Sequence, residues 1–382
     1  MRLTDPWVSD ARTQAVCRVL TDVGYQVFFV GGCVRNALLG APVNDIDLST
    51  NAHPEVVTEL AQAAGLHVVP TGIEHGTVTV ISGGLPHEVT TFRRDVETDG
   101  RRAVVAFAQT IEDDARRRDF TMNALYAKPD GEVVDPLGGL PDLVQRHVRF
   151  IEDAERRITE DYLRILRFFR FHAWYGDPHE GLDAEGLAAS AALSEGLEGL
   201  SKERVTAEML KLLAAQDPAP AMASMFMAGC LHRVLPGTDS KALPILLEFE
   251  QQAGVKPDPI RRLVALGGDQ IETYLRLSKA QVRRVIGLRD SVSNMRKLAE
   301  VAYRHDAKTA LDVALLRGAM FETPLSPDLN DQIAKGANAA FPIKAADLML
   351  AYQGSELGKR LRALEDKWIA SGFSLTKEAL LR

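Results

Sequence analysis

The chain has 382 residues, of which 45 are Lys or Arg and 52 are Asp or Glu, so its formal net charge is −7. This length favours two to four domains over a single core, and the hydrophobic fraction of 46% excludes a fibrous or wholly disordered protein. The negative balance argues mildly against a nucleic-acid binder, but it does not say where the charges lie.

The three cysteines, Cys17, Cys33 and Cys230, are isolated from one another in the sequence. This spacing predicts neither a disulfide framework nor a thiolate metal site, and it favours a reducing compartment. The first residues contain no apolar run of signal-peptide length, and no stretch approaches the roughly 18 consecutive apolar residues of a membrane span. We therefore expect a cytoplasmic protein that does not associate with membranes.

Residues 27–134 alternate short β-branched runs with helical stretches, which predicts an α/β or α+β unit. The predicted strands are 27–30, 46–48, 77–81, 87–92 and 103–107. The predicted helices run from Cys33 to Gly40, from Pro54 to Gly65 with Val56, Val57 and Leu60 buried, and onward from Thr110, where Asp113 completes a capping-box-like start. A hairpin is expected around Asp130 and Gly131.

Beyond Asp135 the strand signals fade, and apolar residues recur at three- and four-residue spacing to the end of the chain. This periodicity is typical of amphipathic helices. Segments rich in Pro and Gly divide the pattern into short helices, and they lie at 177–181, 216–220, 235–239 and 255–259. The second half of the chain is therefore expected to be helical.

Two glycines follow the first predicted strand in the segment FFVGGCVRNALLG. At a strand-to-helix junction, Gly31 and Gly32 let the backbone approach a phosphate closely, and the start of the helix adds unpaired N–H groups and a positive dipole. Arg35 lies on this short helix. The segment is a candidate phosphate seat, although a Gly-Gly pair by itself is more often a simple turn.

Two carboxylates lie in the next segment, PVNDIDLST. Because side chains alternate along a strand, Asp45 and Asp47 are expected to share one face, while Ile46 and Leu48 point into the core. Carboxylates on one face suit Mg2+, which keeps waters and takes its remaining ligands from substrate phosphates. By itself, an Asp-x-Asp pair is more often a solvated strand end.

In this order, the glycine pair and the carboxylate pair resemble the polymerase-beta-like nucleotidyltransferases. The surrounding residues resemble the bacterial class II tRNA nucleotidyltransferases, which are CCA-adding enzymes, and their poly(A) polymerase relatives. The resemblance is strongest over residues 27–175. It implies an α+β fold, with a mixed-sheet head flanked by helices and then an all-helical neck, body and tail. It also implies that Asp45 and Asp47 are catalytic and hold Mg2+, and that Gly32 and Arg35 bind the nucleotide.

The segment ARRRDFTMNALY, residues 115–126, matches the family's arginine-aspartate-phenylalanine-threonine motif. Arg118 can neutralise a triphosphate oxygen, while Asp119 and Asn123 can anchor this turn or the sugar through hydrogen bonds. Standing alone, the stretch would indicate a surface arginine cluster at a helix end. The resemblance makes Arg118 a candidate nucleotide-binding residue.

The segment RITEDYLRILRFFRF, residues 157–171, matches the family's glutamate-aspartate-x-x-arginine motif. We expect Asp161 and Arg164, three apart on one helix, to be neighbours that present an acceptor beside a forked donor. The resemblance implies that this pair reads cytosine or adenine, and that Arg167 and Arg170 also bind the nucleotide. The alternative is an i,i+3 surface ion pair.

Glu88 allows two interpretations: a third acidic group near the metal, or a polar residue on the solvated face of a strand, which is favoured. Arginines flank an acidic centre after Phe92 and are candidates to touch RNA or gate the nucleotide pocket; they are Arg93, Arg94, Arg101 and Arg102. Asn36 stands where the family commonly has aspartate, which argues against any role that needs a charge at that position.

The basic residues concentrate between Lys256 and Lys308, where twelve Lys or Arg stand against six Asp or Glu. The local net charge is therefore +6. Several of these arginines fall on predicted helices, which favours an electrostatic track for the backbone of a folded RNA. An ordinary solvated helical face is the alternative.

The resemblance implies a template-independent enzyme that adds C, C and A to the tRNA 3′ end from CTP and ATP. We predict a nucleotidyltransferase head over 1–138, a neck with the base-selecting helix over 139–205, a body over 206–290 and a tail over 291–382 that binds tRNA. The alternatives are a poly(A) polymerase, an enzyme that adds only CC or only A, and, more remotely, a non-catalytic RNA-binding protein on this fold.

Overall fold

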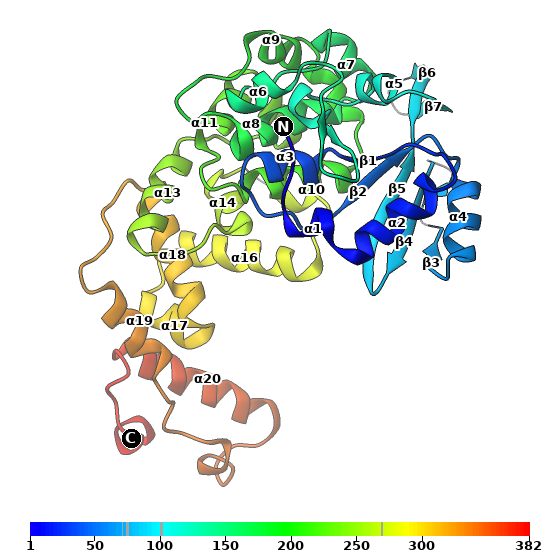
Figure 1. Ribbon diagram of the computed structural model, residues 1–382. Coiled ribbons are helices and arrows are strands. Elements are labelled where there is room, and N and C mark those ends of the chain that lie inside the picture. Colours follow the sequence, from blue (N-terminus) through cyan, green and yellow to red (C-terminus); the bar gives the residue numbers. More distant parts are fainter. Residues whose placement is uncertain (71, 74–75, 100–101, 269) are drawn as a thin grey trace. The chain divides into compact units, whose positions relative to one another are not determined.

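The computed structural model describes residues 1–70, 72–73, 76–99, 102–268 and 270–382. The described chain divides into two compact units, Met1–Pro236 and Gly237–Arg382. The first unit contains the described strands together with helices, and the second is built from helices (Figure 1). The expected fold class, an α+β head followed by helices, is confirmed.

The described strands of the first unit form a mixed sheet in the order β3-β4-β5-β2-β1-β8-β9 and a separate ribbon of β6 and β7 (Figure 1). β2 and β5 run parallel, and the other neighbouring strands are antiparallel. The strand bounds are β1 Val27–Val30, β2 Asp47–Thr50, β3 His67–Val69, β4 Thr77–Ser82, β5 Leu85–Thr91, β6 Arg93–Asp99, β7 Arg102–Phe107, β8 Tyr126–Ala127 and β9 Val133–Val134.

One face of this sheet is covered, and the other carries polar side chains. Strand β4 buries Val78 and Val80, and β5 buries Val89, all on the covered face. Helices α2 (Ala11–Thr21) and α4 (Pro54–Ala63) pack against these strands, as Figure 1 shows. Because side chains alternate along a strand, the neighbouring polar residues of β2 and β5 are left on the opposite face.

The local signals in the head were largely correct. Pro54 begins α4, and the Thr110 side chain caps α5 (Ile111–Arg116) by accepting the backbone N–H of Asp113. Gly131 turns the β8-β9 hairpin with a φ of 86°. Two predictions were wrong: Val56 and Leu60 are only half-buried, because α4 turns Val57 and Ala61 inward. Strands β3 and β6 were not predicted.

The remaining elements of the first unit are helical. They are α1 Pro6–Ser9, α3 Gly32–Leu38, η2 Thr121–Asn123, α6 Leu140–Val144, α7 Ala154–Glu160, α8 Leu163–Tyr175, α9 Ala184–Ala192, η3 Ser194–Gly199, α10 Lys202–Leu213, α11 Ala219–Met227 and α12 Cys230–Val234. Helix α8 packs on α10 and α11. Phe120 packs against Phe150 and Phe171, with ring centroids 4.9 and 4.7 Å away. These buried aromatic contacts fix α8 beside the turn that carries Arg118 and Asp119.

The second unit contains α13 Ala242–Gln252, α14 Pro259–Ala265, α15 Ile271–Tyr274, α16 Lys279–Ser293, α17 Leu298–Arg304, α18 Ala307–Met320, α19 Leu329–Ala337, η4 Ala345–Asp347, α20 Gly354–Ala370 and α21 Lys377–Leu381. Apolar residues around Trp368 and Leu364 form the core of its C-terminal part. Within the part of the chain that the structure describes, none of the helices has the length and apolar character needed to cross a membrane.

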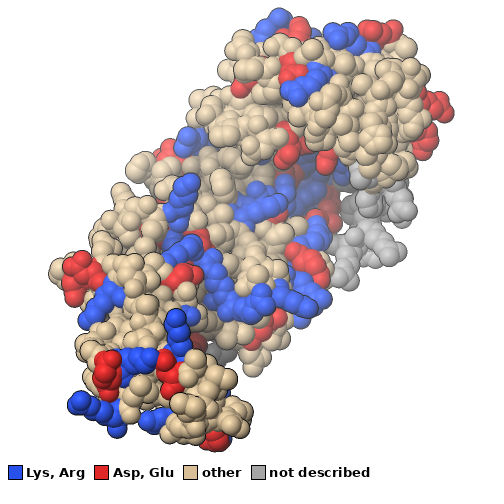
Figure 2. Space-filling view, turned by 90° about the horizontal axis from the view of Figure 1, so that it is seen from below, with Lys and Arg blue, Asp and Glu red and all other residues tan. Residues whose placement is uncertain are grey.

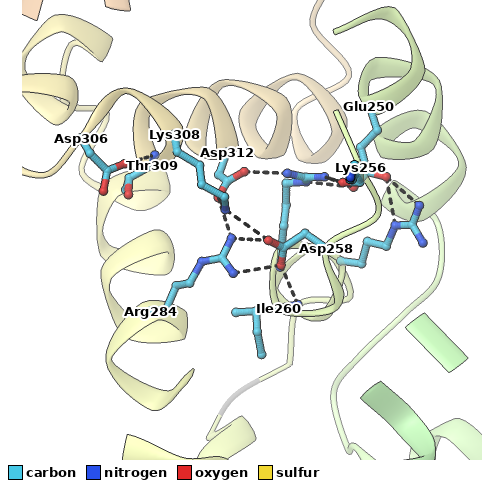
Figure 3. A network of polar contacts seen from close by, with 11 residues as sticks. Glu250, Lys256, Asp258, Ile260, Arg284, Asp306, Lys308, Thr309 and Asp312 are labelled. Carbon is cyan, nitrogen blue, oxygen red and sulfur yellow. Dashed lines mark hydrogen bonds and ion pairs between the residues drawn. The ribbon is translucent and has the colours of Figure 1, made fainter. Parts of the chain in front are cut away.

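A buried network of charges joins α13, α14, α16 and α18 (Figure 3). Arg261 donates to Glu250 over 2.8 Å and to Asp312 over 2.6 Å. Arg262 donates to the other oxygen of Glu250 over 2.7 Å. At its edge, Arg284 binds Asp312 over 2.7 Å. The ion pairs of Arg261 and Arg262 are shielded from water, and the partly exposed Arg284 extends the network to α16.

This network corrects the expected RNA track in part. Arg261 and Arg262 are 2% and 1% exposed, so they are not available to phosphates as the sequence suggested. Their positive charge is balanced by carboxylates, as a buried guanidinium requires. Figure 2 shows other Lys and Arg side chains at the surface, with acidic side chains among them. In α16, the exposed basic residues include Lys279 and Arg283.

Candidate active site

The glycine turn after β1 leaves room for another group to lie close to its backbone. Gly31 has a φ of 67°, a conformation that favours glycine. A Cβ atom at this position would lie 3.2 Å from Nη1 of Arg118. The next residue, Gly32, begins α3. The chain therefore brings a glycine backbone, the start of a helix and the Arg118 side chain to one place.

The two predicted carboxylates lie beside this turn. Asp47 is the first residue of β2, and Asp45 lies just before the strand instead of within it. Ile46 and Leu48 are buried, as the alternation predicted. A small cavity of about 170 Å³ is lined by Gly32, Cys33, Arg35, Asn36, Val43, Asn44, Asp45 and Asp47. The glycine turn, Arg35 and both carboxylates thus border one space.

Glu88 lies next to Asp47 in the sheet. The two residues are partners in the parallel register of β2 and β5, and Glu88 is exposed. Burial, and then the negative charge of Glu88, raise the pKa of Asp47 to about 6, against the opposing effect of Arg118. Acidic groups that repel one another in a half-buried site are stabilised by a bound cation.

The carboxylates fit a metal ion that keeps ligands from outside the protein. Among the described residues, no group of three or more His, Cys, Asp or Glu side chains is arranged to hold a metal ion by itself. Mg2+ is commonly bound through one or two carboxylates together with waters and substrate phosphates. Asp45 and Asp47, at the border of an open cavity, match that kind of site.

Arg35 is 5% exposed and is held by neutral groups. Its guanidinium donates to Oδ1 of Asn123 over 2.6 Å, to Oδ1 of Asn36 over 2.9 Å and to the hydroxyl of Tyr175 over 2.9 Å. It also lies 4.0 Å from the centre of the Tyr175 ring. Burial lowers the pKa of Arg35. Asn36 is therefore an uncharged hydrogen-bond partner of the arginine beside it.

Arg118 is tied to a carboxylate that the sequence did not single out. It donates to Asp114 over 3.1 Å and to the Tyr126 hydroxyl over 3.2 Å. Tyr126 in turn donates to Asp114 over 2.7 Å. Burial would raise the pKa of Asp114, but Arg118 and Tyr126 lower it below its usual value. The i,i+4 spacing of Asp114 and Arg118 was the signal available in the sequence.

Asp119 and Asn123 anchor the turn between α5 and η2. Oδ1 of Asp119 accepts from the amide of Asn123 over 3.0 Å, and Oδ2 accepts from Nε of Arg167 over 2.6 Å. Burial would raise the pKa of Asp119, but Arg167 and Asn123 lower it to about 2. Asn123 thus links Asp119 to Arg35.

The expected pairing of Asp161 and Arg164 on one helix is wrong. Asp161 lies between α7 and α8 with a φ of −157°, and its Oδ1 accepts the backbone N–H of Leu163 over 3.1 Å. This bond to the residue two positions later forms an Asx turn, which competes with continuous helical hydrogen bonding. Arg164 lies in the first turn of α8 and donates to Glu160 over 2.6 Å. The two side chains therefore have separate partners.

Helix α10 contributes two partners that sequence reasoning missed. Arg204 donates to Oδ2 of Asp161 over 2.6 Å, and Glu208 accepts from Arg170 over 2.5 Å. These residues lie about 40 positions from their partners, and nothing in the local pattern of α10 marks them. The helix holds in place side chains that were predicted to bind the nucleotide.

The arginines after Phe92 lie in and near the β6-β7 ribbon. Arg93 and Arg94 begin β6, a strand that the sequence did not predict. Arg101 is outside the described residues, and Arg102 begins β7 with its side chain undescribed. Their proposed contacts with RNA or with the nucleotide pocket stay a prediction.

Comparisons with known proteins place this geometry in a family. Residues 27–149 match the family described as poly A polymerase head domain, and residues 182–241 match the probable RNA and SrmB-binding site of polymerase A. The CCA-adding enzyme of Lactobacillus delbrueckii subsp. bulgaricus is 33% identical over 90% of this chain and 87% of its own length. The chain belongs to the CCA tRNA nucleotidyltransferase family.

Other members of the CCA tRNA nucleotidyltransferase family extend the likeness to nearly the whole chain. The human mitochondrial CCA tRNA nucleotidyltransferase 1 is 30% identical, with 100% of this chain and 92% of that protein covered. The crystal structure of the Bacillus stearothermophilus CCA-adding enzyme in complex with CTP superposes with a TM-score of 0.71 and 26% identity, covering 96% of this chain and 94% of that one. The expected family and nucleotidyltransferase fold are confirmed.

Proposed function

We propose that this protein is a template-independent enzyme that adds C, C and A to the tRNA 3′ end from CTP and ATP and releases pyrophosphate. The observation that carries the proposal is the cavity bordered by Gly32, Arg35, Asp45 and Asp47. It brings together a glycine backbone that can bind phosphate, the positively charged guanidinium of Arg35 and two carboxylates. Phosphoryl transfer depends on groups of these kinds. Relatives that bear the name CCA-adding enzyme support this choice of reaction.

The reaction is attack by the tRNA 3′-hydroxyl on the α-phosphate of the nucleotide. Asp45 and Asp47 would hold the divalent ion, for which we propose Mg2+. When bound, this ion lowers the pKa of the attacking hydroxyl and offsets charge on the phosphates. The glycine turn and Arg35 orient the triphosphate, and Arg118 adds positive charge beside the turn. Most of the rate enhancement would come from positioning and electrostatics.

Selection of the base is assigned to Asp161 and Arg164, with Arg167 and Arg170 as further nucleotide contacts. A carboxylate can accept the exocyclic amino group that cytosine and adenine share, and a guanidinium can donate to ring acceptors. Uracil and guanine present the opposite pattern at these positions. Arg164 and Asp161 hydrogen-bond to Glu160 and Arg204, so reading a base requires each of them to share or exchange a partner.

The predicted subdivision into head 1–138, neck 139–205, body 206–290 and tail 291–382 is retained as part of the proposal. In it, the tail binds tRNA, and exposed basic side chains such as Lys279 and Arg283 of α16 contribute to the electrostatic attraction. Arg261 and Arg262 are not included, because their charges are used inside the second unit.

Incorporation of labelled nucleotides tests the reaction. The purified chain would be given Mg2+, labelled CTP or ATP, and tRNA that ends before C, after CC, or after the complete CCA. Three additions in the order C, C, A are expected, with none on the complete tRNA. Long A tails on unrelated RNA would instead indicate a poly(A) polymerase, and addition of only CC or only A a partial enzyme. Absence of incorporation while tRNA still binds would overturn every enzymatic reading.

A further inference from the structure

Tyr175 makes two contacts with Arg35 from the far end of another element. It is the last residue of α8, whereas Arg35 lies on α3, 140 positions earlier. Its hydroxyl accepts from Nη2 of Arg35 over 2.9 Å, and its ring centre lies 4.0 Å from the guanidinium carbon. Phe171, one turn earlier on α8, has its ring centre 5.0 Å from the same carbon. Helix α8 therefore supplies both an acceptor and aromatic faces to this arginine.

Arg35 differs from the other arginines of the site in the partners that hold it. The others form ion pairs with carboxylates: Arg118 with Asp114, Arg164 with Glu160, Arg167 with Asp119 and Arg170 with Glu208. Within the described part of the chain, the hydrogen-bond acceptors recorded for the Arg35 guanidinium are the neutral groups of Asn36, Asn123 and Tyr175.

The neutral partners of Arg35 determine how its guanidinium can interact with a ligand. A carboxylate that forms an ion pair with a guanidinium neutralises much of its charge, whereas amide and hydroxyl oxygens fix its orientation and leave the charge in place. An aromatic face attracts the cation and restricts its rotation without a counter-charge. Because Arg35 lines the cavity together with Asp45 and Asp47, its charge lies beside the place proposed for the triphosphate.

We propose that Tyr175 is a positioning residue for nucleotide binding. It holds the Arg35 guanidinium with its ring and its hydroxyl, so that the arginine meets the triphosphate already oriented. The proposal rests on the proposed function in that the ligand is a nucleoside triphosphate. Tyr175 acts through Arg35 and has no role in choosing the base, so CTP and ATP are affected equally.

Two substitutions separate the ring from the hydroxyl. Tyr175→Phe keeps the ring and removes the acceptor, and we expect it to raise the KM for both CTP and ATP about threefold to tenfold. Tyr175→Leu removes both contacts and is expected to raise KM further, with kcat and the KM for tRNA changed less than twofold. Trp174→Phe is the matched control, because Trp174 lies next in sequence but donates to the backbone of Lys211 instead.

A binding measurement separates this proposal from the proposed reaction. Calorimetric titration of the full chain with inorganic triphosphate and Mg2+ requires neither tRNA nor turnover. Weaker triphosphate binding in Tyr175→Leu supports the positioning role even if no CCA addition is found. If the wild type adds CCA but Tyr175→Leu binds triphosphate and both nucleotides as the control does, the proposal fails and the reaction stands.

A double-variant cycle tests whether Tyr175 acts through Arg35. In an Arg35→Ala background, Tyr175→Leu should cause no further loss of triphosphate affinity, because its effect is already removed. Full additivity of the two losses would overturn the proposal. A circular dichroism spectrum and a melting temperature equal to those of Trp174→Phe show that a loss is not due to misfolding.

Discussion

Arginine and carboxylate side chains gather in two regions of this protein, with different outcomes. Around the cavity of the first unit, Arg118 forms an ion pair with Asp114, whereas the hydrogen-bond acceptors of Arg35 among the described residues are neutral groups. In the second unit, Arg261 and Arg262 share the buried Glu250 between them. Figure 3 shows this second set enclosed between helices.

The two regions differ in whether the charged side chains are neutralised by one another or are free to interact with a ligand. In the network of the second unit, the carboxylate oxygens of Glu250 and Asp312 are taken up by guanidinium groups, and the charges are hidden from water. In the first unit, Arg35 and the carboxylates Asp45 and Asp47 face a cavity. The first arrangement is suited to binding charged ligands, and the second is suited to holding helices together.

Removing the open carboxylates should have the largest effect on function. In Asp45→Ala combined with Asp47→Ala, we expect incorporation of both CTP and ATP to fall at least about 10³-fold, because both carboxylates proposed to hold the divalent ion are removed. Single-turnover incorporation measures this. Asp22→Ala, an exposed aspartate at the end of α2, is the control. Retention of more than a tenth of the activity in the double variant would contradict the assignment.

Breaking the closed network should affect stability instead. Glu250→Gln leaves two buried guanidinium groups without their shared counter-charge, and the free energy of unfolding should fall by about 3–5 kcal/mol. Denaturant unfolding followed by circular dichroism measures the loss. Glu248→Gln, on the exposed face of the same helix, should change it by less than about 0.5 kcal/mol. Equal losses in the two variants would show that the network is not stabilising.

A third variant tests whether Arg164, which is paired with Glu160 in the first unit, contributes to selection of the base. Arg164→Ala should reduce discrimination of CTP and ATP against UTP and GTP about tenfold to hundredfold, as the loss of a bidentate base contact does. Ratios of kcat/KM for the four nucleotides measure it. Arg156→Ala, a more exposed partner of Glu160, is the control. Unchanged selectivity in Arg164→Ala would remove Arg164 from base reading.

The sequence predicted what depends on local pattern. Pro54 at the start of α4, the Thr110 cap and the Gly131 turn are determined by residues within a few positions of one another. The buried Ile46 and Leu48 followed from alternation along a strand. The residues expected around one phosphate seat border one cavity because they flank a single strand-to-helix turn and the strand beside it.

Contacts between distant segments could not be predicted in this way. Tyr175 and Arg204 reach Arg35 and Asp161 only because α8 and α10 pack in the first unit. The positions of Asp161 and Arg164 fitted a continuous helix in the sequence, but α7 ends at Glu160, Asp161 has an extended backbone, and α8 begins only at Leu163. Arg261 and Arg262 carry charges that, in the sequence, are indistinguishable from those of surface arginines. Burial decides their role, and burial depends on tertiary packing.

The smallest expected effect concerns the exposed basic residues of the segment between Lys256 and Lys308. Lys279 and Arg283 are four apart on one exposed face of α16, and the described residues offer them no recorded ion pair. Lys279→Gln and Arg283→Gln should each weaken tRNA binding about twofold to fivefold at 0.1 M salt. Each should also reduce the slope of log K against log salt by about 1, since one phosphate contact is lost. Arg18→Gln, on the exposed side of α2, is the control. An unchanged slope in both α16 variants would exclude Lys279 and Arg283 from the contacts with RNA phosphates.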